Sequence, residues 1–377
     1  MNKANGKRLV LELIKSDNTD DSSIRELLKQ IIDYPWVLGQ LLFNRMGGVA
    51  YLTLKRCGLL GNINREFRNS LKNSYEIQKI KAESFMQGLA VLADVFEGVT
   101  FPYAFLKGSF LIPRLYALGE RTSNDYDIMV NQKDLDRIGE LLADNGFVQG
   151  KCNFNKMEIK EATRFEILSS RMNRGETVPF HKRVDLPGME ILEVDINFST
   201  DYKAKGIGDL VEKMLNNTEP LEVGDYKSLK TLGKEEFFIY LCCHLFKEAT
   251  VYNWVKMQRD LSLYKFCDIY LFFFKYFKEP ESIEKLIERI KEYGLNKECS
   301  FALVNTGKIY PSIENEDSFR RLLKEIQPED MQFMTRVIYP EGQQLFTYDM
   351  EFTDWLFMHN RVELLQEMRG MGNEAQI

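Results

Sequence analysis

The sequence predicts an α+β protein in which a small mixed sheet with its own helices is flanked by helical regions on both sides. Two observations carry this prediction. Apolar residues recur at helical spacing in the first and last parts of the chain. The middle part instead contains short strand-like runs separated by helical patterns. We therefore expect three regions: an N-terminal helical region (1–98), an α/β core (99–205) and a C-terminal helical domain (206–377).

The flanking regions owe their predicted helices to periodic apolar residues with capping signals. The run SSIRELLKQII opens with Ser22, and a long amphipathic pattern ends at Gly98. After residue 205 the pattern returns to helix. The helices predicted for the two flanks are 22–32, 76–98, 233–249, 262–277, 281–294 and a last helical piece near 351–368.

The middle region alternates strands and helices. YAFLKG and NDYDIMVN read as strands, and the helix expected between them tolerates Pro113 only near its first turn. A second helix ends at Gly146, a common helix terminator. The strands predicted for the core are 103–108, 124–131, 164–170 and 190–199, and its helices are 109–119 and 132–147.

Composition and charge argue against several classes of partner and site. The chain has 377 residues and a formal net charge of −6, which argues against a long nucleic acid as the partner, because phosphate binding needs a basic surface. Six cysteines without a C-x-x-C pair, together with three histidines, argue against a zinc site. The N-terminus has no apolar signal segment, and no apolar run is long enough to span a membrane. We therefore expect a cytoplasmic protein that does not bind membranes.

Two carboxylates in one predicted strand raise the question of a metal. Side chains alternate along a strand, so Asp125 and Asp127 point the same way while Tyr126 packs on the other face. Asp195 lies in a later apolar strand and would complete a three-carboxylate site on a neighbouring strand. Such a site is suited to Mg²⁺, with two ions expected and Mn²⁺ as a substitute, and to displacement at phosphorus. The alternative is a pair of solvated aspartates at a strand edge.

The residues before this strand predict a phosphate-binding segment. In LKGS, Gly108 permits close approach of the backbone, and Ser109 stands at the expected start of a helix, whose free N–H groups attract anions. Lys107 adds a positive charge and Arg121 a second one. The alternatives are a solvated Lys107, a helix-capping Ser109 and an Arg121 that pairs with a nearby acid.

These motifs resemble a known family. FLKGSFLIPRLYALGERTSNDYDIMV is similar to the Gly-Ser…Asp-x-Asp signature of the DNA polymerase β-like nucleotidyltransferases, and more narrowly to the bacterial uncharacterised nucleotidyltransferase family. The resemblance spans roughly residues 36–275. The matching positions are Leu106-Lys107-Gly108, Leu115-Tyr116, Arg121, Asp125-Tyr126-Asp127-Ile128-Met129-Val130 and Gly146-Phe147.

Two of the chain's departures from the family's pattern concern histidines. The later strand of this family often has an acid followed by Leu-His-Trp, whereas here Asp195 is followed by Ile196, Asn197 and Phe198. A second His often follows the one that corresponds to His244, and here none does. Any role that depends on those histidines is therefore open.

A later helix carries further candidates for the nucleotide. His244 and Lys247 are three residues apart and share one helical stripe, from which both could contact a nucleotide. The alternative for His244 is a packing role. Asp268 lies in an apolar helix, where we favour a structural ion pair with Arg259 or Lys265 over catalysis.

The resemblance implies a polymerase β-like core and a specific activity. The enzyme would transfer a nucleoside monophosphate from an NTP to an acceptor hydroxyl and release pyrophosphate. The metal-binding and catalytic residues would be Asp125, Asp127 and Asp195, and the nucleotide-binding residues would be Lys107, Gly108, Ser109, Arg121, His244 and Lys247. The acidic pI of about 5.5 favours a small molecule or a peptide over tRNA as the acceptor. The alternative from another class is a non-catalytic module that binds a nucleotide or a partner protein.

Overall fold

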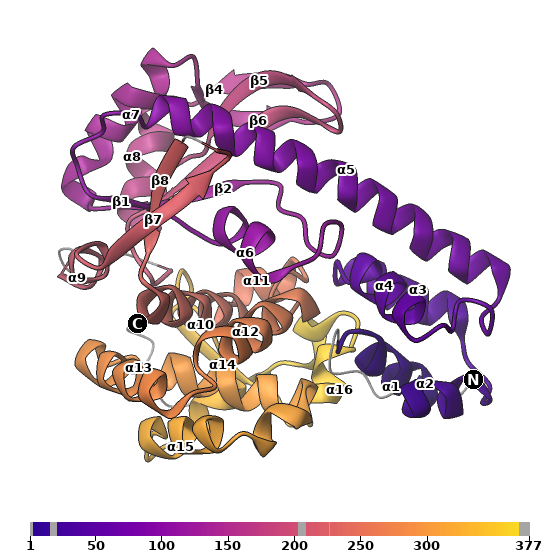
Figure 1. Cartoon of the computed structure of the whole chain (residues 1–377). Coiled ribbons are helices and arrows are strands. Elements are labelled where there is room, and N and C mark those ends of the chain that lie inside the picture. Colours follow the sequence, from indigo (N-terminus) through magenta and orange to yellow (C-terminus); the bar gives the residue numbers. More distant parts are fainter. Residues whose placement is uncertain (1–2, 16–20, 203–208, 226, 369–377) are drawn as a thin grey trace. The chain divides into compact units, whose positions relative to one another are not determined.

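The structure is a computed structural model that describes residues 3–15, 21–202, 209–225 and 227–368 (Figure 1). The chain forms two compact units. The first unit comprises Met1–Lys79, Gly119–Arg121 and Leu241–Ile377, and the second comprises Ile80–Leu118 and Thr122–Tyr240. The two units alternate along the chain, whereas the three regions expected from the sequence are consecutive.

Helices make up most of the first unit. The helices α5 and α10 contribute residues to both units, since α5 runs through Lys79 and Ile80 and α10 through Tyr240 and Leu241. The helices that lie wholly or partly in the first unit are α1 (Lys3–Leu13), α2 (Asp21–Leu28), α3 (Tyr34–Phe43), α4 (Gly47–Arg56), α5 (Arg65–Val95), α10 (Lys234–Thr250), α11 (Tyr252–Lys256), α12 (Leu263–Tyr276), α13 (Pro280–Tyr293), α14 (Asn296–Ile309), α15 (Asp317–Ile326) and α16 (Phe352–Leu356).

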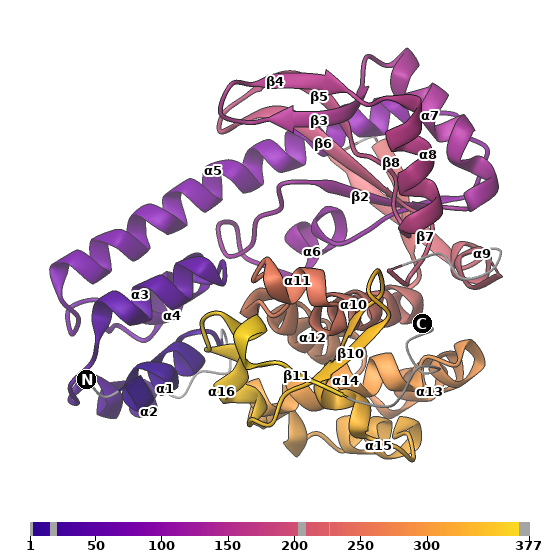
Figure 2. The ribbon, with the colours of Figure 1, turned by 180° about the vertical axis from the view of Figure 1, so that it is seen from behind.

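The second unit is built on a mixed sheet of eight strands, visible from both sides in Figures 1 and 2. Its strands are β1 (Tyr103–Phe105), β2 (Tyr126–Val130), β3 (Val148–Asn153), β4 (Glu158–Glu161), β5 (Phe180–Leu186), β6 (Met189–Asn197), β7 (Thr218–Val223) and β8 (Lys227–Leu232), and its further helices are α6 (Gly108–Leu115), α7 (Leu135–Asp144), α8 (Arg164–Asn173) and α9 (Asp209–Leu215). The spatial order is β4-β3-β5-β6-β2-β1-β8-β7. The strand β2 is therefore central, parallel to β6 and antiparallel to β1.

One face of this sheet packs against α5. The ring of Tyr126 stacks on Phe85 with 4.2 Å between centroids, and its hydroxyl donates a hydrogen bond to the Phe85 carbonyl oxygen at 2.8 Å. A Cβ at Gly88 would lie 2.2 Å from the Tyr126 hydroxyl and 2.7 Å from the Leu192 side chain, so only glycine permits this approach. Residues 126, 128, 192, 194 and 196 share this buried face because side chains alternate along a strand. The residues between them point to the opposite face.

The mixed sheet and flanking helices agree with the predicted class, but several elements differ from the prediction. Residues 164–170, expected as a strand, belong to the helix α8. A capping box between Thr163 and Glu166 begins this helix. In the region expected to be helical, β7 and β8 instead extend the sheet.

The end of the chain also differs from the prediction. A second sheet of three strands in the first unit, β9 (Arg336–Tyr339), β10 (Gln344–Thr347) and β11 (Gln366–Glu367), was not expected. The helix predicted near 351–368 is limited to the short α16 and one 3-10 turn, η5 (Arg361–Leu364).

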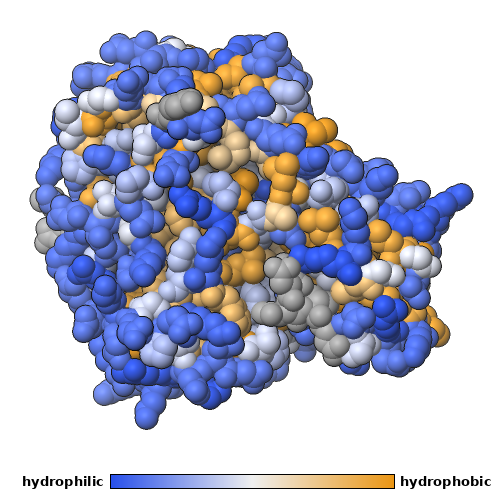
Figure 3. Space-filling model, viewed as in Figure 1, coloured by the Kyte–Doolittle hydropathy of each residue, from blue (hydrophilic) through white to orange (hydrophobic). Residues whose placement is uncertain are grey.

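Hydrophilic side chains cover most of the molecular face drawn in Figure 3, with apolar side chains in smaller groups between them. Within the described ranges, no helix combines the length and the apolar character needed to cross a bilayer.

Candidate active site

Three aspartates meet at the centre of the eight-stranded sheet. The parallel register of β2 and β6 places Asp127 directly beside Asp195, on the face opposite α5. Asp125 lies immediately before β2 rather than inside it, because the strand begins at Tyr126. Asp127 is 2% exposed, while Asp125 and Asp195 are half-buried. The structure therefore brings together the three carboxylates singled out from the sequence.

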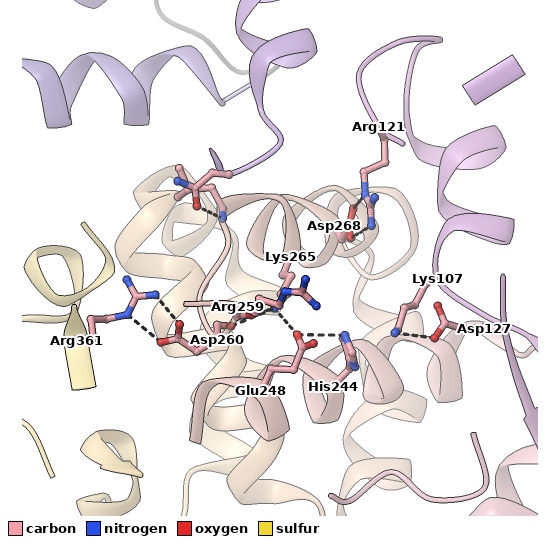
Figure 4. A network of polar contacts seen from close by, with 12 residues as sticks. Lys107, Arg121, Asp127, His244, Glu248, Arg259, Asp260, Lys265, Asp268 and Arg361 are labelled. Carbon is pink, nitrogen blue, oxygen red and sulfur yellow. Dashed lines mark hydrogen bonds and ion pairs between the residues drawn. The ribbon is translucent and has the colours of Figure 1, made fainter. Parts of the chain in front are cut away.

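Protein groups contact two of these carboxylates. The Lys107 ammonium donates to Asp127 Oδ1 at 2.8 Å (Figure 4), and the Asn197 amide approaches the same oxygen at 3.4 Å. The Ser123 hydroxyl donates to Asp125 Oδ1 at 3.0 Å. The second oxygen of Asp127, Oδ2, is buried and has no hydrogen-bond partner among the described residues. A buried carboxylate oxygen in this state is costly unless a cation or donor satisfies it.

Burial and mutual repulsion raise the pKa values of the two strand aspartates. Burial raises the pKa of Asp127 to about 6 and the charge of Asp125 adds to this, although Lys107 and Asn197 lower it. The pKa of Asp195 is raised well above its ordinary value, first by burial and then by the charges of Asp125, Asp127 and the neighbouring glutamates 176 and 193. The site thus holds more negative charge than its protein partners neutralise.

The glycine of the LKGS segment has a packing role, and its predicted approach to a phosphate stays a prediction. A Cβ on Gly108 would lie 2.5 Å from Ser123 Cβ, so glycine is required where α6 packs against the segment that leads to Asp125. The helix begins at Gly108, and its N-cap residue is Lys107. Ser109 is therefore not the helix cap. Its side chain is fully buried, and its hydroxyl lacks a hydrogen-bond partner within the described part of the chain.

The donor set fits a hard cation, although its present arrangement is not that of a bound metal. Carboxylate oxygens are the ligands that Mg²⁺ prefers, and Asp127 Oδ2 lacks a donor. Among the residues that the structure describes, however, no group of three or more His, Cys, Asp or Glu side chains has a geometry that could hold a metal ion. The contacts of Lys107 with Asp127 and of Ser123 with Asp125 are part of this arrangement.

Arg121 belongs to the first unit and does not present its charge to solvent. Its guanidinium donates two hydrogen bonds to Asp268, from Nε and Nη2, both at 3.1 Å (Figure 4). It also lies over the ring of Tyr264, 4.4 Å from the centroid. Both partners of the pair are 5% exposed. Arg121 thus pairs with a buried acid, as the alternative expected, and its phosphate contact stays a prediction. Asp268 forms a structural ion pair, and the structure shows it with Arg121.

His244 and Lys247 also lie in the first unit, on α10, and both are half-buried. His244 Nε2 is 3.3 Å from Glu248 Oε2, and Glu248 forms an ion pair with Lys265 (Figure 4). Neither residue is in the unit that contains the three aspartates. Their part in nucleotide binding stays a prediction.

Sequence reasoning overlooked three residues that surround the aspartates. Asn197 lies two positions after Asp195 in β6, so strand alternation could have identified it. Ser123 lies two positions before Asp125 and precedes β2, where strand alternation does not apply. Glu176 comes from a segment outside the named strands that bridges to Asn197. No local sequence signal points to that pairing, because the bridge joins segments that are 21 positions apart in the chain.

The fold places a cluster of three carboxylates at the centre of the sheet. The chain belongs to the family described as uncharacterised nucleotidyltransferase, whose family model matches residues 32–311. This confirms the family predicted from the LKGS and NDYD motifs, and it indicates a transferase. Comparison with the curated proteins finds no match, and comparison with the solved structures finds none either.

Proposed function

We propose that this protein transfers a nucleoside monophosphate from an NTP to an acceptor hydroxyl, with a polymerase β-like core in its second unit. The observation that carries the proposal is the parallel register that sets Asp127 beside Asp195, with Asp125 just before the same strand. Membership of a nucleotidyltransferase family supports the reaction class. Aspartates on two central strands match what a displacement at phosphorus requires.

Asp125, Asp127 and Asp195 would hold Mg²⁺, in one or two ions. When bound, the metal supplies charge neutralisation for the phosphates and the leaving pyrophosphate. The half-buried Asp125 and Asp195 and the buried Asp127 would provide the oxygen ligands. The raised pKa values of Asp127 and Asp195 support a cation at this site, because protonation and cation binding both relieve a concentration of buried negative charge.

Asp195 is the candidate general base. The acceptor hydroxyl gives its proton to the Asp195 carboxylate while its oxygen attacks the α-phosphorus. The bond from that phosphorus to the bridging oxygen breaks, and pyrophosphate leaves with the bonding electron pair. A carboxylate whose pKa is raised above its ordinary value is a better proton acceptor than an ordinary aspartate.

The start of α6 is the candidate phosphate-binding segment. The first N–H groups of a helix attract anions, and α6 begins at Gly108 directly beside the aspartates' strand. The buried Ser109 hydroxyl without a partner in the described chain is a further donor for a phosphate oxygen. Because the tight packing of Gly108 on Ser123 fixes this segment relative to Asp125, it would hold the triphosphate in register with the metal ligands.

The acceptor belongs to the small-molecule or peptide class under this proposal. The net charge of −6 disfavours tight binding of a polyanion such as tRNA. A shift of the protein on tRNA at about 0.15 M salt would contradict this part of the proposal.

Labelling with nucleotides tests the reaction. The protein is incubated with each α-³²P-labelled NTP, Mg²⁺ and a cell extract, and the labelled fraction is identified by size. We expect label transfer and pyrophosphate release that fall about 10³-fold or more in Asp127→Asn, equivalent to about 4 kcal/mol of transition-state stabilisation. Asp136→Asn is the matched control, because Asp136 is an exposed aspartate on α7 of the same unit.

Two outcomes would contradict the proposal. Activity that survives Asp127→Asn would show that the aspartate cluster is not the site of chemistry. Tight NTP binding by calorimetry without pyrophosphate release would instead support a non-catalytic nucleotide-binding module.

A further inference from the structure

Lys107 lies on an oxygen that a metal ion would use. Its Nζ is 2.8 Å from Asp127 Oδ1, and the two side chains are 18% and 3% exposed (Figure 4). A close ammonium–carboxylate pair with so little solvent contact is strong, because water screens it poorly. The pair therefore competes directly with any cation that needs this oxygen.

The backbone holds Lys107 over Asp127 in an unusual conformation. Its φ is +42° and its ψ is −116°, a region that residues with a Cβ rarely adopt. The neighbouring backbone is fixed, since the Leu106 N–H donates to the Asp127 carbonyl oxygen at 2.9 Å and the Leu111 N–H donates to the Lys107 carbonyl oxygen at 2.8 Å. Strain of this kind persists at functional sites where the surrounding structure enforces it.

The negative charges around Asp127 explain why the Lys107 ammonium is held against it. Asp125 and Asp195 surround Asp127, and Glu176 and Glu193 add negative charge at Asp195. Lys107 opposes this concentration of charge from its position on Asp127. The same residue is the N-cap of α6, so a phosphate group at the start of that helix would be within the reach of the same side chain.

We propose that the Lys107 ammonium is an internal cation that occupies the metal-binding oxygen of Asp127 in the metal-free protein, and that a divalent cation displaces it toward the NTP phosphates. This inference rests on the proposed function and deepens it. The displaced ammonium loses its carboxylate partner when metal binds alone, and it gains a phosphate partner when the NTP is present. Metal and NTP therefore bind cooperatively, and metal alone binds weakly.

Calorimetry on the full chain tests the competition. Mg²⁺ is titrated alone and then together with a non-hydrolysable α,β-methylene NTP, in the wild type and in Lys107→Met. We expect the variant to bind Mg²⁺ alone roughly tenfold more tightly and the Mg²⁺–analogue complex roughly tenfold more weakly, as removal of one charge-assisted contact in each state implies. Lys133→Met is the control, because Lys133 is an exposed lysine paired with Glu212 in the same unit.

A purely structural role for Lys107 would not produce effects of opposite sign. Weaker or unchanged Mg²⁺ binding in Lys107→Met would overturn the competition. If Lys107→Met does not fold, the wild type still provides a test through amine labelling read by mass spectrometry. We expect slow labelling of Lys107 in the metal-free protein, faster labelling with Mg²⁺ alone, and slow labelling again with Mg²⁺ and the analogue.

The outcomes separate this inference from the proposed function. Saturating Mg²⁺ that binds while Lys107 labelling stays constant would overturn the displacement and leave the metal site intact. Absence of Mg²⁺ binding with and without the analogue, in both the wild type and Lys107→Met, would overturn the proposed metal site as well.

Discussion

Buried acids in the two units are balanced in different ways. In the first unit, Asp260 is fully buried and receives two hydrogen bonds from Arg361, and Asp268 is matched in the same way by Arg121. In the second unit, Lys107 pairs with Asp127, which lies beside two further aspartates, and one oxygen of Asp127 lacks a donor among the described residues. A buried acid that receives two hydrogen bonds from an arginine indicates a structural pair, whereas a cluster of acids indicates a place for a mobile cation.

The largest stability effect is expected where the match is complete. Asp260→Ala leaves the buried Arg361 charge without its carboxylate and should lower the free energy of unfolding by about 3–5 kcal/mol. Urea unfolding followed by circular dichroism measures it. The control Asp354→Ala removes an exposed partner of Lys7 and should cost less than about 1 kcal/mol. Equal losses in the two variants would remove the distinction between buried and exposed pairs.

Removing the charge of Asp127 should stabilise the metal-free protein rather than destabilise it. Burial makes the folded protein bind a proton at Asp127 more tightly than the unfolded chain, with a pKa of about 6 against 3.8. This contribution to stability is present below about pH 3.8 and is lost as the pH rises through about 6. Since asparagine carries no charge, Asp127→Asn should stabilise the metal-free protein at about pH 8, by up to about 3 kcal/mol.

Chemical unfolding at two pH values in a chelator measures this gain. The gain in stability from Asp127→Asn should shrink toward zero at about pH 4, where the wild-type Asp127 carboxyl is protonated in the folded protein. A variant that is less stable than the wild type at pH 8 would mean that the ion pair with Lys107 outweighs the cost of burial.

Close packing at the edge of the site predicts a smaller effect. Gly108→Ala places a Cβ 2.5 Å from Ser123 Cβ, so Ser123 must move and its hydrogen bond to Asp125 is disturbed. We expect a loss of about 1–3 kcal/mol in stability together with reduced activity. Gly139→Ala in α7 is the matched control, because its nearest neighbour would be 3.8 Å away and alanine favours helix. A thermal-shift assay that shows no difference between the two variants would contradict the packing argument.

The smallest effect on stability is expected on the face of β2 that packs against α5, opposite the aspartates. Tyr126→Phe removes the buried hydrogen bond to the Phe85 carbonyl oxygen but keeps the ring stack, and it should cost about 0.5–1.5 kcal/mol. Nucleotidyl transfer should continue at the wild-type rate below the unfolding temperature. A large loss of activity would show that the two faces of this strand are not independent.

Local patterns predicted the parts of the site that depend on alternation. Asp127, Tyr126 and Asp195 occupy the faces expected from period-two spacing, and the family resemblance identified the segment around Gly108. The partner of Arg121 was not predictable, because Asp268 lies 147 positions away in the chain. Long-range pairing of this kind leaves no trace in a local window of sequence.

The misassigned elements show where local pattern and capping disagree. The run at 164–170 looked like a strand, yet Phe165 is 79% exposed and α8 has no buried residue. The Thr163 and Glu166 capping box was the better signal, since it is specific to helix starts. The strands β7 and β8 lie at one edge of the sheet, where few apolar residues are needed to mark a strand.

The alternation of the two units along the chain has a consequence for synthesis on the ribosome. All residues of the second unit have been made once the chain reaches Tyr240, whereas the first unit needs Leu241–Ile377 in addition to its N-terminal helices. Domains complete their folding as their residues emerge. We therefore expect the eight-stranded sheet to form before α1–α4 can pack with the rest of the first unit, which is synthesised later. The three-residue segment Gly119–Arg121 would join the first unit only after Asp268 has left the ribosome, so this unit matures last although it contains the start of the chain.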